Sequence, residues 1–164
     1  MLALAVPMLC LGLAACGFRP MHASQSFGAA PVAADIVVAP IPDRLGQQVR
    51  NALIDRLTPR GLPARPAYEL VVALSDEVEG YGFEPDREVT RERVRLTALY
   101  RLMDLTSGEA VLAGEARALV AYDVVQSDFA AFATRQDARE EAAQTLVADI
   151  VARIAAAELD ARGP

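Results

Sequence analysis

Cys16 is the residue whose surroundings define a chemistry most clearly. It follows Leu13, Ala14 and Ala15 and precedes Gly17. A cysteine after two small residues, at the end of an apolar segment, is typical of the site where bacteria attach lipid to an exported protein. The predicted reaction is thioether formation between the Cys16 thiol and a diacylglyceryl group, followed by addition of an N-acyl chain such as palmitate. The acyl chains would hold the protein on a membrane at about 0.8 kcal/mol per buried CH₂.

Residues 1–15 contain no charged side chain and are too few to span a bilayer, so we predict a signal peptide that is removed. Lipidated Cys16 would then begin a tether of residues 16–34, which joins a single domain of residues 35–160. Gly17 stands where an aspartate favours retention in the inner membrane, so the outer membrane is the expected location. The alternative is that Cys16 is an ordinary buried thiol of an apolar helix.

Arg91, Arg93 and Arg95 form the second pattern with chemical potential. Their spacing of two on a predicted strand directs the three guanidinium groups to one side of the sheet. Guanidinium groups bind phosphates and carboxylates with two parallel hydrogen bonds, so this row could contact an anionic lipid headgroup or an acidic partner. The alternative is that these arginines pair with carboxylates of neighbouring strands, among them Glu69, Glu77 and Glu115.

Other functions are disfavoured by composition. The net charge of −6 argues against a nucleic-acid partner. His22 is the only histidine and has no cysteine or carboxylate at ligand spacing, so no metal and no cofactor are expected. The sequence contains no nucleophile elbow and no phosphate-binding or dinucleotide-binding motif, and we expect the protein not to be an enzyme.

The elements that position these residues follow from the apolar periodicity. A short β-branched apolar run predicts a strand at residues 35–41, alternation predicts strands at 68–78 and 88–104, and the turn residues after Met103 predict a partner strand at 110–125. A spacing of three and four predicts helices at 43–57 and 127–159. Asp43 is expected to cap the first helix, and Gly80 and Gly82 to form a turn. One apolar stripe of the second helix should cover the sheet: Phe129, Phe132, Ala143, Leu146, Ile150 and Ile154.

This order of elements predicts an α+β domain of two layers. We expect a four-stranded, mostly antiparallel sheet with two helices packed on one face. The tight reversal predicted at residues 104–109 joins the last two strands into a hairpin. The opposite face, which carries the arginine row, would be left open to a protein or an amphiphile.

Several local motifs carry a resemblance to a known family. They follow one another along the chain: CGFRPM at 16–21, LGQQVRNAL at 45–53, YEL at 68–70, TR at 90–91, YRLMD at 100–104, YDVVQSDFA at 122–130 and DAREEA at 137–142. With the lipidation site and the element order, the chain resembles the LPS-assembly lipoprotein family LptE, in its alphaproteobacterial form.

The resemblance implies a lipoprotein that plugs the outer-membrane β-barrel LptD, helps this barrel to assemble, and assists delivery of lipopolysaccharide to the outer leaflet. It also implies a possible direct contact with lipopolysaccharide. Two other functions stay open at this point. One is an accessory lipoprotein of an inner-membrane ABC-type lipid transporter, and the other is a lipid-tethered periplasmic enzyme.

Overall fold

The computed structural model describes residues 35–83, 89–124 and 127–162. Along the described chain the order is β1 (Ile36–Val38), α2 (Asp43–Leu57), β2 (Tyr68–Phe83), β3 (Val89–Asp104), β4 (Ala110–Asp123) and α3 (Asp128–Arg162). The predicted α+β class and the predicted order of strands and helices are confirmed. Cys16 and the proposed signal peptide and tether lie outside the described residues.

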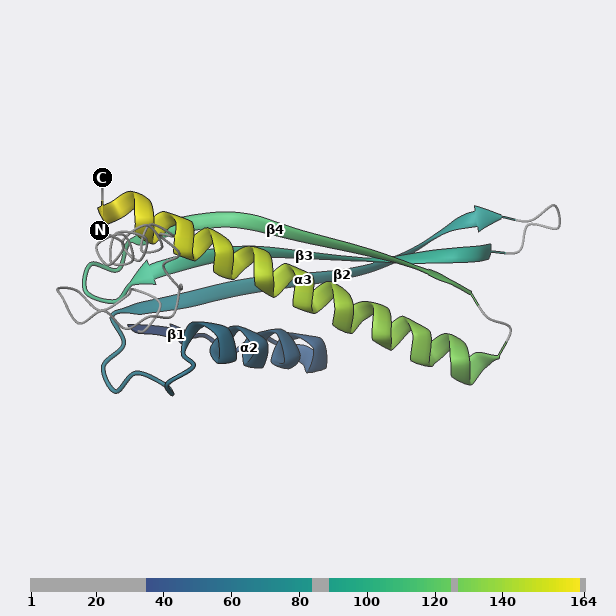
Figure 1. The fold of residues 1–164 in the computed structure, drawn as a ribbon, viewed down its shortest axis with the longest axis horizontal. Helices are drawn as coiled ribbons and strands as arrows, with labels where there is room; N and C mark the ends of the chain where they lie inside the picture. The colour runs from purple at the N-terminus through teal and green to yellow at the C-terminus, as the bar shows by residue number, and fades with distance from the viewer. Residues whose placement is uncertain (1–34, 84–88, 125–126, 163–164) are drawn as a thin grey trace, which may run out of the picture.

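The sheet has the strand order β1-β2-β3-β4. The short β1 pairs in parallel with the start of β2, while β2 pairs with β3 and β3 with β4 in antiparallel fashion. The three long strands extend well beyond β1 and α2, and α3 runs along them, so the molecule is elongated (Figure 1). We call the end at β1 the proximal end and the opposite end of the long strands the distal end.

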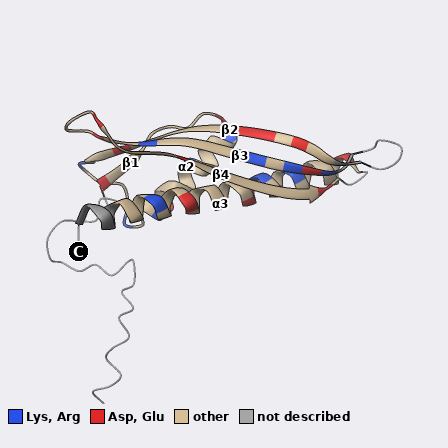
Figure 2. Ribbon diagram, turned by 90° about the horizontal axis from the view of Figure 1, so that it is seen from above, with Lys and Arg blue, Asp and Glu red and all other residues tan. Residues whose placement is uncertain are grey.

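Side chains alternate between the two faces of the sheet, as a strand requires. Leu70 lies opposite Leu102, and Leu96 lies opposite Ala118, and all four are buried against the helices. The odd-numbered residues of β3 point to the other side, which no helix covers in the described structure (Figure 2). The expected packing of both helices on one face is confirmed.

The core lies between the sheet and the helices and is built from aliphatic side chains. Its largest fully buried members are Ile36, Leu53, Leu70, Leu96, Leu146, Ile150, Ile154, Val38, Val49, Val94 and Val147. These residues come from β1, α2, β2, β3 and α3, so every described element except β4 supplies a large fully buried side chain. Alanines of β4 complete the layer, and their small size lets α3 approach the sheet closely.

Polar contacts join α3 to the sheet nearer the distal end. Arg135 donates to the hydroxyl of Tyr122 over 2.9 Å and to the Glu92 carboxylate over 2.9 Å, and the Tyr122 hydroxyl also donates to Glu92. One turn further along α3, Arg139 donates to Asp76 over 2.8 Å. These groups replace the aliphatic contacts that hold the proximal half together.

Two sequence-based expectations about turns and caps differ from the structure. Gly80 and Gly82 do not form a turn, because β2 continues through them to Phe83 with register shifts opposite β3. Glycines in a strand commonly mark such irregular pairing. Asp43 is the first residue of α2 with φ of +67°, while Pro42 takes the cap position without a side-chain hydrogen bond.

The predicted apolar stripe of α3 is correct only in its C-terminal part. Leu146, Ile150 and Ile154 are buried, but Phe129 is 82% exposed and Phe132 is 57% exposed. The sheet-facing groups nearer this end of the helix are Arg135 and Arg139, which bind sheet carboxylates. Helical spacing alone therefore gave the wrong environment for the two phenylalanines.

Candidate functional site: the open face of the sheet

The candidate site is the sheet surface on the side away from the helices, which we call the open face. It is formed by the odd-numbered residues of β2, β3 and β4, as the pairing of Ala73 with Leu99 and of Leu99 with Glu115 shows. The open face has two parts with different chemistry. Ion pairs between β2 and β3 occupy its distal half, and apolar residues mixed with single charged groups lie towards its centre and proximal end.

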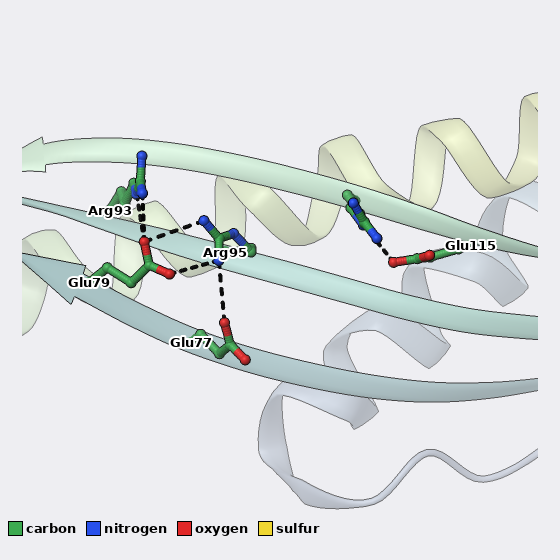
Figure 3. Close-up of polar contacts among 6 residues, drawn as sticks. Glu77, Glu79, Arg93, Arg95 and Glu115 are labelled. Atoms are coloured by element: carbon green, nitrogen blue, oxygen red, sulfur yellow. Dashed lines mark hydrogen bonds and ion pairs between the residues drawn. The ribbon is translucent and has the colours of Figure 1, made fainter.

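The charged half brings Arg93 and Arg95 of β3 beside Glu77 and Glu79 of β2 (Figure 3). Arg93 contacts Glu79 Oε2 through Nη2 at 2.7 Å, and Arg95 Nη1 contacts Glu79 Oε1 at 2.7 Å. A longer contact of 3.5 Å joins Arg95 to Glu77. We call these four residues the ion-pair ladder. Figure 2 shows the acidic part of β2 next to the basic part of β3.

The carboxylate of Glu79 is the centre of this ladder. Its hydrogen bond with Arg93 is the largest influence that lowers the pKa of Glu79 below the ordinary value, and the charge of Arg95 adds to it. Tyr81, two residues further along β2, lies under the guanidinium of Arg93 at 5.7 Å from the ring centroid. Because surface ion pairs contribute little stability, the ladder mainly fixes where the arginines point.

Arg91 takes a different partner, Asp123 at the end of β4. The Arg91 Nε lies 2.7 Å from Asp123 Oδ1, and this hydrogen bond raises the pKa of Arg91. Arg91, Arg93 and Arg95 are therefore on one face of one strand, as predicted, and each of them is paired with a carboxylate. Their contact with an anionic ligand or partner stays a prediction.

The apolar part of the open face is formed by all three long strands. Leu99 is 59% exposed and Leu119 is 55% exposed, although both lie within regular strands. A hollow beside Leu99 is lined by Val71, Ala73 and Ala113, with Arg101 and Glu115 at its margin. Leu99 lies opposite Glu115 and Leu119 lies opposite Arg95, so the pair formed by Thr97 and Arg117 separates the two exposed leucines. The exposed leucines and the hollow make this part a candidate contact surface.

Behind the hollow, on the helix-covered side of the sheet, Gly114 lies opposite Tyr100. A Cβ at Gly114 would lie 2.5 Å from the Tyr100 hydroxyl and 2.8 Å from Cζ, so the ring occupies the space that a side chain would take. Tyr100 is only 2% exposed and forms part of the floor under the open face.

Sequence reasoning identified the arginines and one of their partners, Glu77, but missed Glu79 and Asp123. Glu79 was missed because β2 was expected to end at Val78. The signal that identifies it is the spacing of two between Glu77 and Glu79, which places both carboxylates on one face if the strand continues. Glu115 pairs with Arg117 of its own strand rather than with the arginine row.

Within residues 35–83, 89–124 and 127–162, no group of three metal-ligating side chains comes together. In the same part of the chain, no helix has the length and apolar character needed to cross a membrane. The open face offers aliphatic surface and paired charges, which suits the binding of another surface.

Comparison with solved structures shows the same fold in three bacterial lipoproteins. A lipoprotein from Caulobacter crescentus CB15 is 23% identical, with a TM-score of 0.64 over 79% of this chain and 93% of that chain. The minor lipoprotein from Acinetobacter baumannii is 16% identical, with a TM-score of 0.61 over 75% and 92% of the two chains. Rare lipoprotein B from Shewanella oneidensis is 14% identical, with a TM-score of 0.62 over 77% and 98%.

A family-level match covers most of the chain, while no curated protein sequence matches it significantly. The sequence model of LptE, described as lipopolysaccharide-assembly, matches residues 32–154. This range includes all strands, helix α2 and most of α3. The match confirms the resemblance found in the local motifs, and this chain belongs to the LptE family of lipopolysaccharide-assembly lipoproteins.

Proposed function

We propose that this protein is an outer-membrane lipoprotein whose domain sits as a plug in the lumen of an LptD-type β-barrel. There it helps the barrel to assemble and assists delivery of lipopolysaccharide to the outer leaflet. The observation that carries the proposal is the open face, where Leu99 and Leu119 are more than half exposed on an elongated sheet. A barrel wall around the domain would cover this face and the edges of the sheet.

The membrane anchor of the proposal is lipidated Cys16, at the end of a signal peptide of residues 1–15. Residues 16–34 would act as the tether, and Gly17 supports sorting to the outer membrane. The anchor keeps the domain at the periplasmic face, where the barrel is available. The proposed role is non-catalytic, in agreement with the description of the family as one of lipopolysaccharide assembly.

Arg91, Arg93 and Arg95 are proposed to contact an anionic group of the barrel or of lipopolysaccharide. Guanidinium groups retain free donors after one carboxylate contact, because each carries five N–H groups. The side chains of Arg93 and Arg95 are each 36% exposed, and that of Arg91 is 57% exposed. Exposed donors on one face support this contact, and the carboxylates of the ladder hold them in position.

The test is affinity purification of the intact lipoprotein from its native envelope in mild detergent, with a high-salt wash and mass spectrometry of the bound proteins. We expect a large outer-membrane barrel in stoichiometric amount. Leu99→Asp should reduce its recovery at least tenfold, because a charge enters the apolar part of the contact. Leu62→Asp is the matched control, since Leu62 is 61% exposed but lies in the loop between α2 and β2.

Each outcome of this purification bears on the proposal. Recovery of an inner-membrane transporter in place of a barrel would contradict it and favour an accessory role in that transporter. Equal loss of the barrel in both leucine variants would show that the open face is not the contact. Loss with Leu99→Asp alone would support the plug and justify charge reversal at Arg91, Arg93 and Arg95.

A further inference from the structure

Strand β4 leaves one long edge of the sheet without a partner among the described residues, because it pairs only with β3. The direction of its backbone groups follows from the pairing across the sheet. Leu70 accepts a hydrogen bond from Ala39 on the β1 side, so its N–H and C=O point away from β3. Leu102 lies opposite Leu70 in an antiparallel ladder, so the N–H and C=O of Leu102 point towards β4, where they pair with Leu112.

From Ala113 to Ala121, the odd-numbered residues of β4 therefore direct their N–H and C=O groups to the free edge, while Val111 lies at the register shift opposite Leu102 and Met103. From Val111 to Ala121 this edge contains no proline and no lysine, which are the residues that commonly protect an edge strand. It carries one acid and one base, Glu115 and Arg117, with Ala116 between them. The strand is otherwise built from aliphatic residues and glycine.

The opposite edge of the sheet, formed by β2, differs in its charge. Beyond Leu70, β2 has no strand partner on its outer side, and Asp76, Glu77 and Glu79 follow one another there. Two copies of this segment would repel each other. The β2 edge is thus protected by like charge, whereas the β4 edge has no such protection.

We propose that the β4 edge is a binding surface for a second copy of this chain, which pairs antiparallel with it around a two-fold axis at Ala116. This register sets Glu115 opposite Arg117 of the second copy and Arg117 opposite Glu115 of the second copy. In the single chain Glu115 and Arg117 pair with each other. Around the axis the two acids and two bases form a group of four, in which each acid also lies opposite a base of the second copy. The charge pattern of the strand is complementary to itself in this register.

The apolar residues agree with the same register. On the open face, Leu119 lies opposite Ala113 of the second copy, so a large side chain meets a small one on both sides of the axis. Leu119 is 55% exposed in the single chain and would be covered in part. The outward backbone groups of these odd-numbered residues lie opposite one another, which is the arrangement that forms hydrogen-bonded pairs.

The helices leave room for this contact. Helix α3 contacts β3 as well as β4, so it lies over the sheet and not beyond its edge. An edge contact alone buries less than the roughly 1,200 Å² of a stable interface. We therefore expect a weak, reversible dimer. The inference does not rest on the proposed function. It applies to the chain outside the barrel, because a barrel wall would cover this edge.

Disulfide cross-linking tests the register directly. Two tagged forms of the full-length chain, one with Glu115→Cys and one with Arg117→Cys, are co-expressed, and isolated membranes are treated with an oxidant. Opposite residues of a hydrogen-bonded pair have Cα atoms about 5.5 Å apart, which is within the range of a disulfide. We expect a cross-linked heterodimer only when both forms are present. Glu77→Cys with Arg117→Cys is the control, and the unsubstituted chain shows any contribution of Cys10 and Cys16.

Charge exchange provides an independent measurement, in which differently tagged full-length chains are co-purified in excess detergent. Glu115→Arg should reduce co-purification at least tenfold, and the exchange Glu115→Arg with Arg117→Glu should restore it. Glu141→Arg, at an exposed position of α3, changes the net charge equally and should have no effect. Ala113→Pro should also prevent pairing, because the N–H of Ala113 points to the free edge and the fold does not use it.

Folding of each variant is checked by circular dichroism, so that loss of pairing is not confused with unfolding. Absence of the mixed disulfide, or a cross-link of equal strength with the Glu77→Cys control, would overturn the proposal. Failure of the charge exchange to restore pairing would exclude this register. A mixed disulfide together with rescue by the exchange would support it.

Discussion

Replacing Gly114 by alanine tests the close contact between β4 and Tyr100. A Cβ at this position would lie 2.5 Å from the Tyr100 hydroxyl oxygen, 2.8 Å from Cζ and 3.2 Å from Cε1. Ordinary contacts of a Cβ begin at 3.4 Å, so the ring must move by several tenths of an ångström. Tyr100 is 2% exposed, and the surrounding core resists this movement. Overpacking of a core typically destabilises a protein by about 1–3 kcal/mol, and we expect about 2 kcal/mol here.

The assay is urea denaturation followed by far-UV circular dichroism, which gives the free energy of unfolding of each variant. A double-mutant cycle with Tyr100→Leu isolates the contact. In that background Gly114→Ala should be neutral or stabilising by up to about 1 kcal/mol, since alanine suits a strand better than glycine. Gly108→Ala is the control: its φ is +74° and no atom lies within 4 Å of the added Cβ, so its loss should be equal in both backgrounds.

The reasoning would be refuted by either of two results. One is a change of less than about 0.5 kcal/mol for Gly114→Ala alone, which would mean that the ring moves without resistance. The other is the same loss with and without Tyr100, which would assign the effect to the backbone and not to the ring.

Three further predictions concern the core, the polar contacts and the exposed aromatic residues. Leu146→Ala should lower the free energy of unfolding by about 2–5 kcal/mol in urea denaturation, because Leu146 is fully buried; a loss below about 1 kcal/mol would contradict its place in the core. Hydrogen bonds from Tyr122 and Arg135 hold the pKa of Glu92 below 4.5, so its contribution to stability is complete above that value and is lost as the pH falls through the folded-state pKa. Glu92→Gln should therefore flatten the fall in stability between about pH 5 and pH 3, and an unchanged acid profile would contradict this. Phe129→Ser and Phe132→Ser should each change the melting temperature by less than about 2 °C, because both rings are mostly exposed; a fall of about 8 °C would place them in the core.

Much of the fold could be predicted because its signals are local. The alternation of Val94, Leu96 and Ala98 indicates a strand with one buried face, and the spacing of Leu146, Ile150 and Ile154 indicates a buried helix face. Both patterns reflect a single burial environment that extends over many residues. The element order and the α+β class followed from them.

The distal end could not be predicted in the same way, because its contacts join residues far apart in the sequence. Glu92, Tyr122 and Arg135 form one polar group, yet nothing in the local pattern of α3 distinguishes Arg135 from a solvated arginine. The exposure of Phe129 could not be predicted for the same reason. Helical spacing indicates which residues share a face of the helix, but not what packs against that face. For the arginine row, the face was predictable, but the partner Glu79 depended on where β2 ends.

Helix α3 is held to the sheet by two kinds of contact, and we expect the two parts of the helix to differ in rigidity. Leu146, Val147 and Ile150 anchor the middle of the helix in aliphatic packing, whereas the part near Arg135 and Arg139 is held by hydrogen bonds at least partly open to water. Local opening is easiest where few buried apolar contacts must be broken. Amide hydrogens of residues 128–140 should exchange faster than those of residues 143–154. The protein therefore has a stiff end and a compliant end, and the compliant end can adjust its thickness to a binding surface without loosening the core.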